Sequence, residues 1–301
     1  MCSSDLLVIE RGRVVPFSQL PPGSIALDGY VQGPALNLDD NKYSFDHHDG
    51  CIRTFTSATC RQVFDCLLLG FDPTGMNVYV NDVDGDTALS IWLLANPTRV
   101  GEEQVRLLVE GVANIDAHGP AYPLLASARG LVDKFYQGAM APEKGARFNK
   151  TYAQADLYAL LMECVHNIDL MLEGSLNYAP RPTKDRVYEI THTGKSGWVM
   201  VKSNDFIFDL LYADGLNKAV AYNQAPDGSW VYTIGKKSEF VSGFPVGPHS
   251  QEGTVLHGLN AVEPGWGGGS TIGGAPRNAD GSRSRLTPDE VFVLIEDLLN
   301  S

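Results

Sequence analysis

The triplet Asp46-His47-His48, followed by Asp49, comes directly after Lys42–Phe45, a segment that reads as a short strand. A hydrophobic strand that runs into a carboxylate and two imidazoles is costly to bury, because buried polar groups need partners and buried charges need opposite charges. A divalent cation would supply that partner. Taken alone, the triplet fits a solvated turn equally well, since histidine is common both as a ligand and at the surface.

Acidic side chains also follow other expected elements. They are Asp28 after the strand 24–27, the cluster Asp82, Asp84 and Asp86 after the strand 76–80, and Asp116 with His118 after the helical stretch 102–115. In open α/β sheets the ligand site lies at the carboxyl ends of the strands, so acidic groups at neighbouring strand ends converge in one crevice. Such convergence is what a two-metal site requires. An EF-hand loop starting at Asp82 is excluded, because Thr87 and Leu93 would replace its required glycine and glutamate.

Strands and helices alternate through the first half of the chain. A strand at 6–9 and helices at 59–69, 88–95, 122–138 and 151–173 complete the pattern. This alternation predicts an α/β fold with a mostly parallel, doubly wound sheet. At 301 residues the chain exceeds the usual size of one domain. The prolines at 180 and 182 mark a linker, so we expect one domain over residues 1–180 and another over 181–301.

The second half predicts a smaller α+β domain. Short β-like runs lie at 187–190, 197–201, 218–222 and 230–234, and a last helix starts at Thr287-Pro288-Asp289-Glu290, whose pattern is a capping box. Between them lies the glycine stretch, defined as residues 265–274. It is either a flexible loop or a backbone nest that binds phosphate.

Charge and cysteine content narrow the function classes. The net charge of −13 and a pI near 4.9 argue against a duplex-DNA or anionic-membrane surface, since both need basic side chains. No apolar run is long enough to cross a bilayer. The cysteines, Cys2, Cys51, Cys60, Cys66 and Cys164, are odd in number, and the N-terminus lacks a signal-peptide pattern. We therefore expect a cytoplasmic protein; a homodimer is compatible with the sequence.

Several of these motifs together resemble the DHH phosphoesterase superfamily. The resemblance rests on the triplet at 46–48, on Asp84-Gly85-Asp86 with Ser90, on Ile115-Asp116, and on the pair of segments 25–28 and 45–48 followed by 56–59. The glycine stretch is similar to the family's G-G-G-H motif. Three departures are visible: the D-x-D motif follows the DHH motif instead of preceding it, Ser270 replaces the motif histidine, and Val80 stands where a further histidine is common.

The resemblance implies a phosphohydrolase or phosphodiesterase with two Mn²⁺ or Mg²⁺ ions, acting on a nucleotide, a short oligonucleotide or a similar small phosphorylated substrate. It implies metal ligands at Asp28, His47, Asp84, Asp86 and Asp116, with Asp82 as an extra ligand. Asp46 would orient a histidine, and His48 would act on the substrate. The substrate-binding residues would be Gly267, Gly268, Gly269, Gly273, Gly274, Arg277 and His118. A non-catalytic nucleotide-binding protein and an inorganic pyrophosphatase remain alternatives.

Overall fold

The structure is a computed structural model that describes residues 7–48, 50–52, 54–179 and 185–300. The chain divides into two compact units, Met1–Gly119 with Leu124–Pro182, and Thr183–Ser301 with Pro120–Pro123. The expected linker prolines at 180 and 182, together with Cys2 and Asp49, lie outside the described residues. Each unit has its own sheet and its own hydrophobic core.

The first unit contains a five-stranded sheet in the order β1-β5-β2-β4-β3. Its strands are β1 (Leu7–Ile9), β2 (Ser24–Leu27), β3 (Ala35–Asn37), β4 (Lys42–Phe45) and β5 (Asn77–Val80). All neighbouring strands run parallel except β3, which pairs antiparallel with β4 at the edge. The prediction of an α/β fold with a mostly parallel sheet is confirmed.

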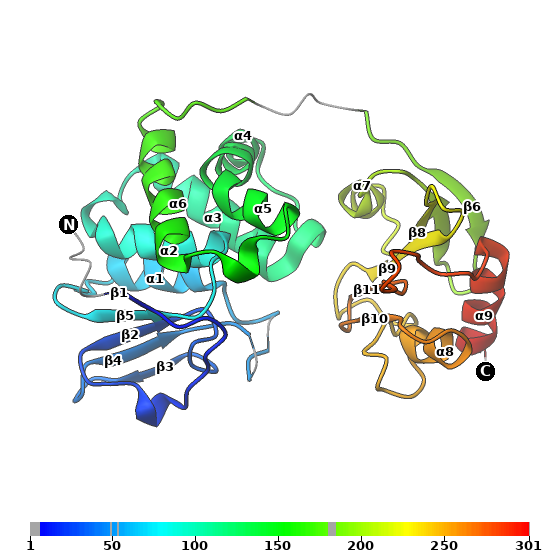
Figure 1. The fold of residues 1–301 in the computed structure, drawn as a ribbon, viewed down its shortest axis with the longest axis horizontal. Coiled ribbons are helices and arrows are strands. Elements are labelled where there is room, and N and C mark those ends of the chain that lie inside the picture. Colours follow the sequence, from blue (N-terminus) through cyan, green and yellow to red (C-terminus); the bar gives the residue numbers. More distant parts are fainter. Residues whose placement is uncertain (1–6, 49, 53, 180–184, 301) are drawn as a thin grey trace. The chain divides into compact units, whose positions relative to one another are not determined.

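The helices of this unit gather on one side of the sheet (Figure 1). They are α1 (Thr59–Leu68), α2 (Gly85–Ala95), α3 (Glu103–His118), α4 (Ala126–Lys134), α5 (Ala141–Phe148) and α6 (Leu157–Leu172), with a π-helical turn, η5 (Phe135–Ala139), between α4 and α5. The helix expected at 122–138 corresponds to α4 and η5, and the one expected at 151–173 to α6. Helix α5 was not expected from the sequence.

Strand β2 shows how the two faces of this sheet differ. Ile25 and Leu27 point into the large helical core, whereas Ala26 points into a small cluster on the opposite face with Tyr30 and Val31. Successive side chains of a strand alternate between faces, so one four-residue strand serves both. In the described part of the chain, a single turn of 3-10 helix, η2 (Phe17–Gln19), and its flanking segments cover this second face instead of an α-helix.

The second unit is built on a six-stranded sheet in the order β10-β11-β9-β8-β7-β6. Its elements are β6 (Glu189–Thr193), β7 (Val199–Lys202), α7 (Phe208–Ala213), β8 (Lys218–Gln224), β9 (Trp230–Lys236), α8 (Val255–Val262), β10 (Gly267–Gly268), β11 (Ile272–Gly274) and α9 (Pro288–Asn300). Helices α8 and α9 pack on one face and α7 on the other. The sheet is mixed, since β7 and β8 are parallel and the other pairs antiparallel.

The capping box expected before α9 is present. The backbone N–H of Thr287 donates to Glu290 Oε2 over 2.8 Å, and the Glu290 N–H donates back to Thr287 Oγ1 over 3.4 Å. These bonds satisfy groups at the helix start that have no partner within the helix.

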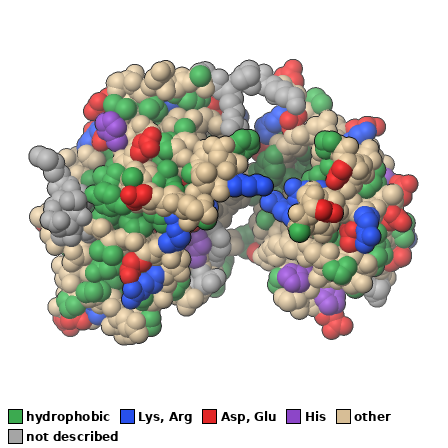
Figure 2. Space-filling view, viewed as in Figure 1, with side chains coloured by type: hydrophobic (Ala, Val, Ile, Leu, Met, Phe, Trp, Pro, Cys, Tyr) green, Lys and Arg blue, Asp and Glu red, His purple; other side chains and the backbone are tan. Residues whose placement is uncertain are grey.

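Acidic and basic side chains are interspersed on the face of the molecule drawn in Figure 2. Among the described residues, no helix combines the length and the apolar character needed to cross a bilayer.

Candidate metal centre

The acidic and histidine side chains meet at the carboxyl ends of three neighbouring parallel strands. Asp28 follows β2, the triplet Asp46-His47-His48 follows β4, and the turn carrying Asp84 and Asp86 follows β5 and starts α2. Since β2 lies between β4 and β5, the three strand ends are adjacent, which is the arrangement expected from the sequence. Asp116 joins them from the last turn of α3.

His47 occupies the centre of this cluster. Its Nε2 atom lies 2.8 Å from Asp116 Oδ2, 3.6 Å from Asp86 Oδ2 and 3.8 Å from Asp28 Oδ1. Its side chain is fully buried, yet neither ring nitrogen makes a hydrogen bond with any described residue. The close approach to Asp116 is therefore not aligned as a hydrogen bond. Buried polar atoms without partners are rare and call for an unseen ligand.

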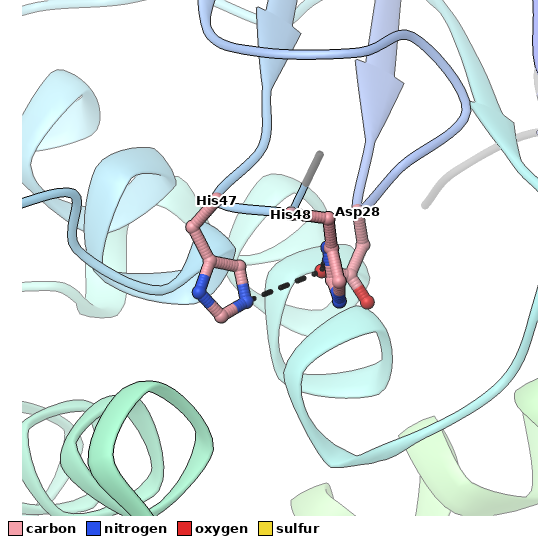
Figure 3. A group of neighbouring side chains, drawn as sticks. All are labelled: Asp28, His47 and His48. Atoms are coloured by element: carbon pink, nitrogen blue, oxygen red, sulfur yellow. Dashed lines mark ion pairs between the residues drawn. The ribbon is translucent and has the colours of Figure 1, made fainter. Parts of the chain in front are cut away.

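Two sets of side chains around His47 are compact enough to hold a cation each. One set is Asp28, His47 and His48, and the other is His47, Asp86 and Asp116, with donor atoms in each set within 4.8 Å of one another. Figure 3 shows the first set, with His47 and His48 on the segment after β4 and Asp28 on the neighbouring one. Because both sets use His47, the two positions are neighbours.

Hydrogen bonds from the starts of two helices fix the carboxylates. The backbone N–H groups of Thr59 and Cys60, in the first turn of α1, each donate to Asp86 over 2.7 Å. The hydroxyls of Thr59 and Thr87 donate to the two oxygens of Asp28 over 3.0 and 3.1 Å. Asp84 caps α2 by accepting from the Thr87 N–H. Helix starts favour negative charge, so these carboxylates keep fixed orientations.

The carboxylates are nevertheless crowded. Burial, together with the charges of Asp86 and Asp116, raises the pKa of Asp84 to about 7. Burial and the charges of Asp84, Asp86 and Asp116 also raise the pKa of Asp28 well above its ordinary value. The pKa of Asp86 is raised by burial and by Asp116. If all of these buried acids were ionised, their charges would repel one another strongly. A bound cation would offset that repulsion.

Asp46 has a different role from the other acids. Its Oδ1 accepts from the backbone N–H of His48 over 3.1 Å and lies 2.9 Å from the Nδ1 of the same histidine, while its Oδ2 accepts from the Gly33 N–H. Burial opposes ionisation, but the bonds from His48 and Gly33 outweigh it and lower the pKa of Asp46. An ionised Asp46 therefore holds the His48 ring, whose side chain is 40% exposed.

Two expected ligands lie in neither set: Asp84, which caps α2, and Asp82, which was expected as an extra ligand. Asp82 has other partners. Its carboxylate is half exposed; it contacts the Tyr152 hydroxyl and lies 3.2 Å from an Arg147 nitrogen. Tyr152 and Arg147 also bond to the backbone of Val83. Asp82 and its two partners therefore form a brace behind the turn that carries Asp84 and Asp86. We call these three residues the Asp82 brace.

The glycine stretch is a β-hairpin at the edge of the second sheet. Gly267 pairs with Gly274 and Gly268 with Gly273. Gly268 has a φ of 150°, and a Cβ added there would lie 2.3 Å from the Gly273 Cα, so a side chain would force the strands apart. Glycine is required at 268 and 273 by close packing, which neither the loop nor the nest hypothesis anticipated. Gly269 follows β10, and Arg277 is exposed beyond β11.

Some residues of the centre were missed from the sequence. Thr59 starts α1 and belongs to the segment 56–59 already noted in the sequence. Thr87 could have been anticipated, because it follows the expected ligand Asp86 in the first turn of α2. Tyr152 and Arg147 could not, because they lie more than 60 residues along the chain from Asp82. His118, expected to contact substrate, is the last residue of α3 and is half-buried.

No protein-family model, no curated protein and no solved structure matches this chain.

Proposed function

We propose that this protein is a metal-dependent phosphoesterase of the DHH type, which hydrolyses a nucleotide, a short oligonucleotide or a similar small phosphoester. The observation that carries the proposal is His47. It is a buried imidazole without hydrogen bonds, shared by two sets of acidic and histidine side chains. Two adjacent sets of carboxylate and imidazole donors suit a pair of Mn²⁺ or Mg²⁺ ions.

The proposed ligands are His47 and the three carboxylates close to it, Asp28, Asp86 and Asp116. Asp84 is added on the resemblance and on its charge interaction with Asp86 and Asp116. When bound, the two ions would lower the pKa of a water molecule and stabilise the attacking and leaving oxygens of the phosphoester. Asp82 is left out of this ligand set, because Arg147 already neutralises it.

His48 is the proposed residue for contact with the substrate. Asp46 accepts from its Nδ1, which orients the ring and favours the form that carries a proton at that nitrogen. The partly exposed ring can then donate from Nε2 when it is charged, either to a phosphate oxygen or to the leaving oxygen. Asp46 is a positioning residue in this scheme, because it acts through His48.

The second unit is proposed to hold the part of the substrate distant from the reacting phosphate. The exposed guanidinium of Arg277 is suited to a forked, charge-assisted contact with phosphate. The hairpin glycines Gly267, Gly268, Gly269, Gly273 and Gly274 are left out of this role, because their backbone groups pair within the second sheet. An extended substrate would need the Arg277 contact, whereas a small phosphodiester would not.

A hydrolysis screen with Mn²⁺ and with Mg²⁺ tests the proposal. The substrates are a generic phosphodiester, short oligonucleotides, cyclic dinucleotides and pyrophosphate, each with wild type and with His47→Ala. We expect hydrolysis of at least one ester by wild type and its loss in the variant. Turnover of pyrophosphate alone would favour the pyrophosphatase alternative. Metal-dependent binding of a nucleotide without turnover would favour the non-catalytic alternative.

A further inference from the structure

Tyr136 lies beside the metal centre but comes from none of the segments that carry the expected ligands. It belongs to η5, the π-helical turn between α4 and α5. Its ring packs against Gly85, the residue between Asp84 and Asp86. A Cβ added to Gly85 would lie 2.9 Å from Tyr136 Cε1 and 3.4 Å from the hydroxyl oxygen. π-helical turns are rare and occur frequently at functional sites.

The Tyr136 ring is held from two sides. The Phe135 ring packs edge-on against it at 5.1 Å between centroids, and the Lys144 ammonium lies 4.8 Å from its centroid. A cation over an aromatic face is attracted by the ring electrons. These contacts fix the ring and leave the hydroxyl as the group that faces the Asp84-Gly85-Asp86 turn.

The Tyr136 side chain is partly exposed, and its hydroxyl lies beside the Asp84-Gly85-Asp86 turn. A phenol is protonated near neutral pH in any case. Burial and the nearby charges of Asp116 and Asp84 raise its pKa further. The hydroxyl is therefore a neutral donor at the edge of an acidic cluster.

We propose that the Tyr136 hydroxyl contacts the substrate at this centre, by donating a hydrogen bond to an oxygen of its phosphate group. The inference rests on the proposed function, since it assumes that a phosphate group binds at the centre. A phosphate oxygen next to the carboxylates needs donors, and Tyr136 provides one without adding negative charge. The contact would be made from the helical layer, whereas His48 approaches from the strand end.

Tyr136→Phe tests this contact, because it removes the hydroxyl and keeps the ring against Gly85 and Lys144. The probe is inorganic phosphate, titrated into Mn²⁺-loaded protein and followed by calorimetry. We expect phosphate affinity to fall about 10- to 100-fold, as for a lost hydrogen bond to a charged group. The Mn²⁺ stoichiometry and affinity should not change. Tyr158→Phe, on the exposed side of α6, is the matched control and should match wild type.

The outcomes separate this inference from the proposed function. Unchanged phosphate affinity in Tyr136→Phe, or no phosphate binding by Mn²⁺-loaded wild type, overturns the Tyr136 contact. An equal loss of Mn²⁺ affinity also overturns it, because Tyr136 would then position ligands instead of touching phosphate. Weakened phosphate binding by Tyr136→Phe in a protein whose wild type hydrolyses no ester supports the contact and rejects the proposed function.

Discussion

His47 belongs to both sets of side chains, so its loss should weaken cation binding whichever set holds the ion. His47→Ala and Asp86→Asn should each lower Mn²⁺ affinity by more than the roughly 10- to 100-fold typical of residues that only support a ligand. Titration of the purified protein with Mn²⁺, followed by calorimetry, measures this. His166→Ala, at an exposed histidine on α6, is the control. A folded His47→Ala protein that binds Mn²⁺ as wild type does would contradict the proposed metal centre.

Asp84 makes the stability of the metal-free protein depend on pH. Its pKa is about 7 in the folded protein against 3.8 ordinarily, so the folded state holds the proton more tightly than the unfolded chain. The contribution of Asp84 to the free energy of unfolding is then greatest below the ordinary pKa and is lost as the pH rises to about 7. Metal binding needs the ionised carboxylate, so Mn²⁺ affinity should rise over the same range.

Melting temperatures measured from pH 4 to 8, in EDTA and in excess Mn²⁺, check this dependence. We expect Asp84→Asn to lack part of the decline that wild type shows in EDTA between about pH 4 and pH 7. The stabilisation by Mn²⁺ should be larger at pH 7.5 than at pH 5. Identical pH profiles for wild type and Asp84→Asn in EDTA would contradict the raised pKa.

The sequence was sufficient to predict that Asp28, His47 and Asp86 lie close together, because strand ends in parallel sheets are adjacent. It was not sufficient to separate Asp82 from Asp84. Both follow β5 within the same short acidic cluster, and only the long-range contacts to Tyr152 and Arg147 show that Asp82 turns to the other side.

Among the elements, the turn between β5 and α2 depends on the Asp82 brace. Tyr152→Phe removes the hydroxyl that bonds to Asp82 and to the Val83 backbone. We expect a loss of about 0.5–1.5 kcal/mol in the free energy of unfolding, because the half-exposed Asp82 and the Val83 backbone lose a hydrogen-bond partner. Mn²⁺ affinity should fall by about 10-fold or more, since the turn carrying Asp84 and Asp86 loosens.

Asp82→Asn distinguishes a brace from a ligand. If Asp82 acts in the brace, Asp82→Asn should lower stability and Mn²⁺ affinity as much as Tyr152→Phe does. The double variant should lower both little further than either single variant, because both changes break the same contact. Chemical denaturation and Mn²⁺ titration measure the two effects. If Asp82→Asn instead abolished Mn²⁺ binding as fully as Asp86→Asn, Asp82 would be a ligand after all.

Strands and helices with a clear hydrophobic period were predicted well. Strands β2 and β4 match their expected limits, and α1 differs by one residue. Helix α5 was missed because it is short and lacks a buried apolar side, Glu143 being its only buried residue among those described. The hairpin of β10 and β11 was missed because glycine has low strand propensity, and its pairing arises from close backbone contact instead.

At the scale of the whole molecule, Arg277 is the better probe of the second unit. Arg277→Ala should raise KM for an extended oligonucleotide by about 10-fold, as for a lost charge-assisted hydrogen bond, and leave a small phosphodiester unaffected. Steady-state kinetics on both substrates measure this. Gly268→Val is less informative, because its Cβ would collide with Gly273 and disrupt the hairpin itself. Equal losses on both substrates for Arg277→Ala would contradict a role for this unit in holding the distal part.

The backbone conformation at Asp28 limits which residues can replace it without destabilising the fold. Its φ is 52°, a left-handed conformation that costs most residues about 1–2 kcal/mol and that asparagine and glycine adopt most readily. Replacement by alanine or valine would remove the carboxylate and strain the turn as well. Descendants of this sequence that kept the fold but abandoned metal binding should therefore carry asparagine or glycine at position 28 far more often than other residues.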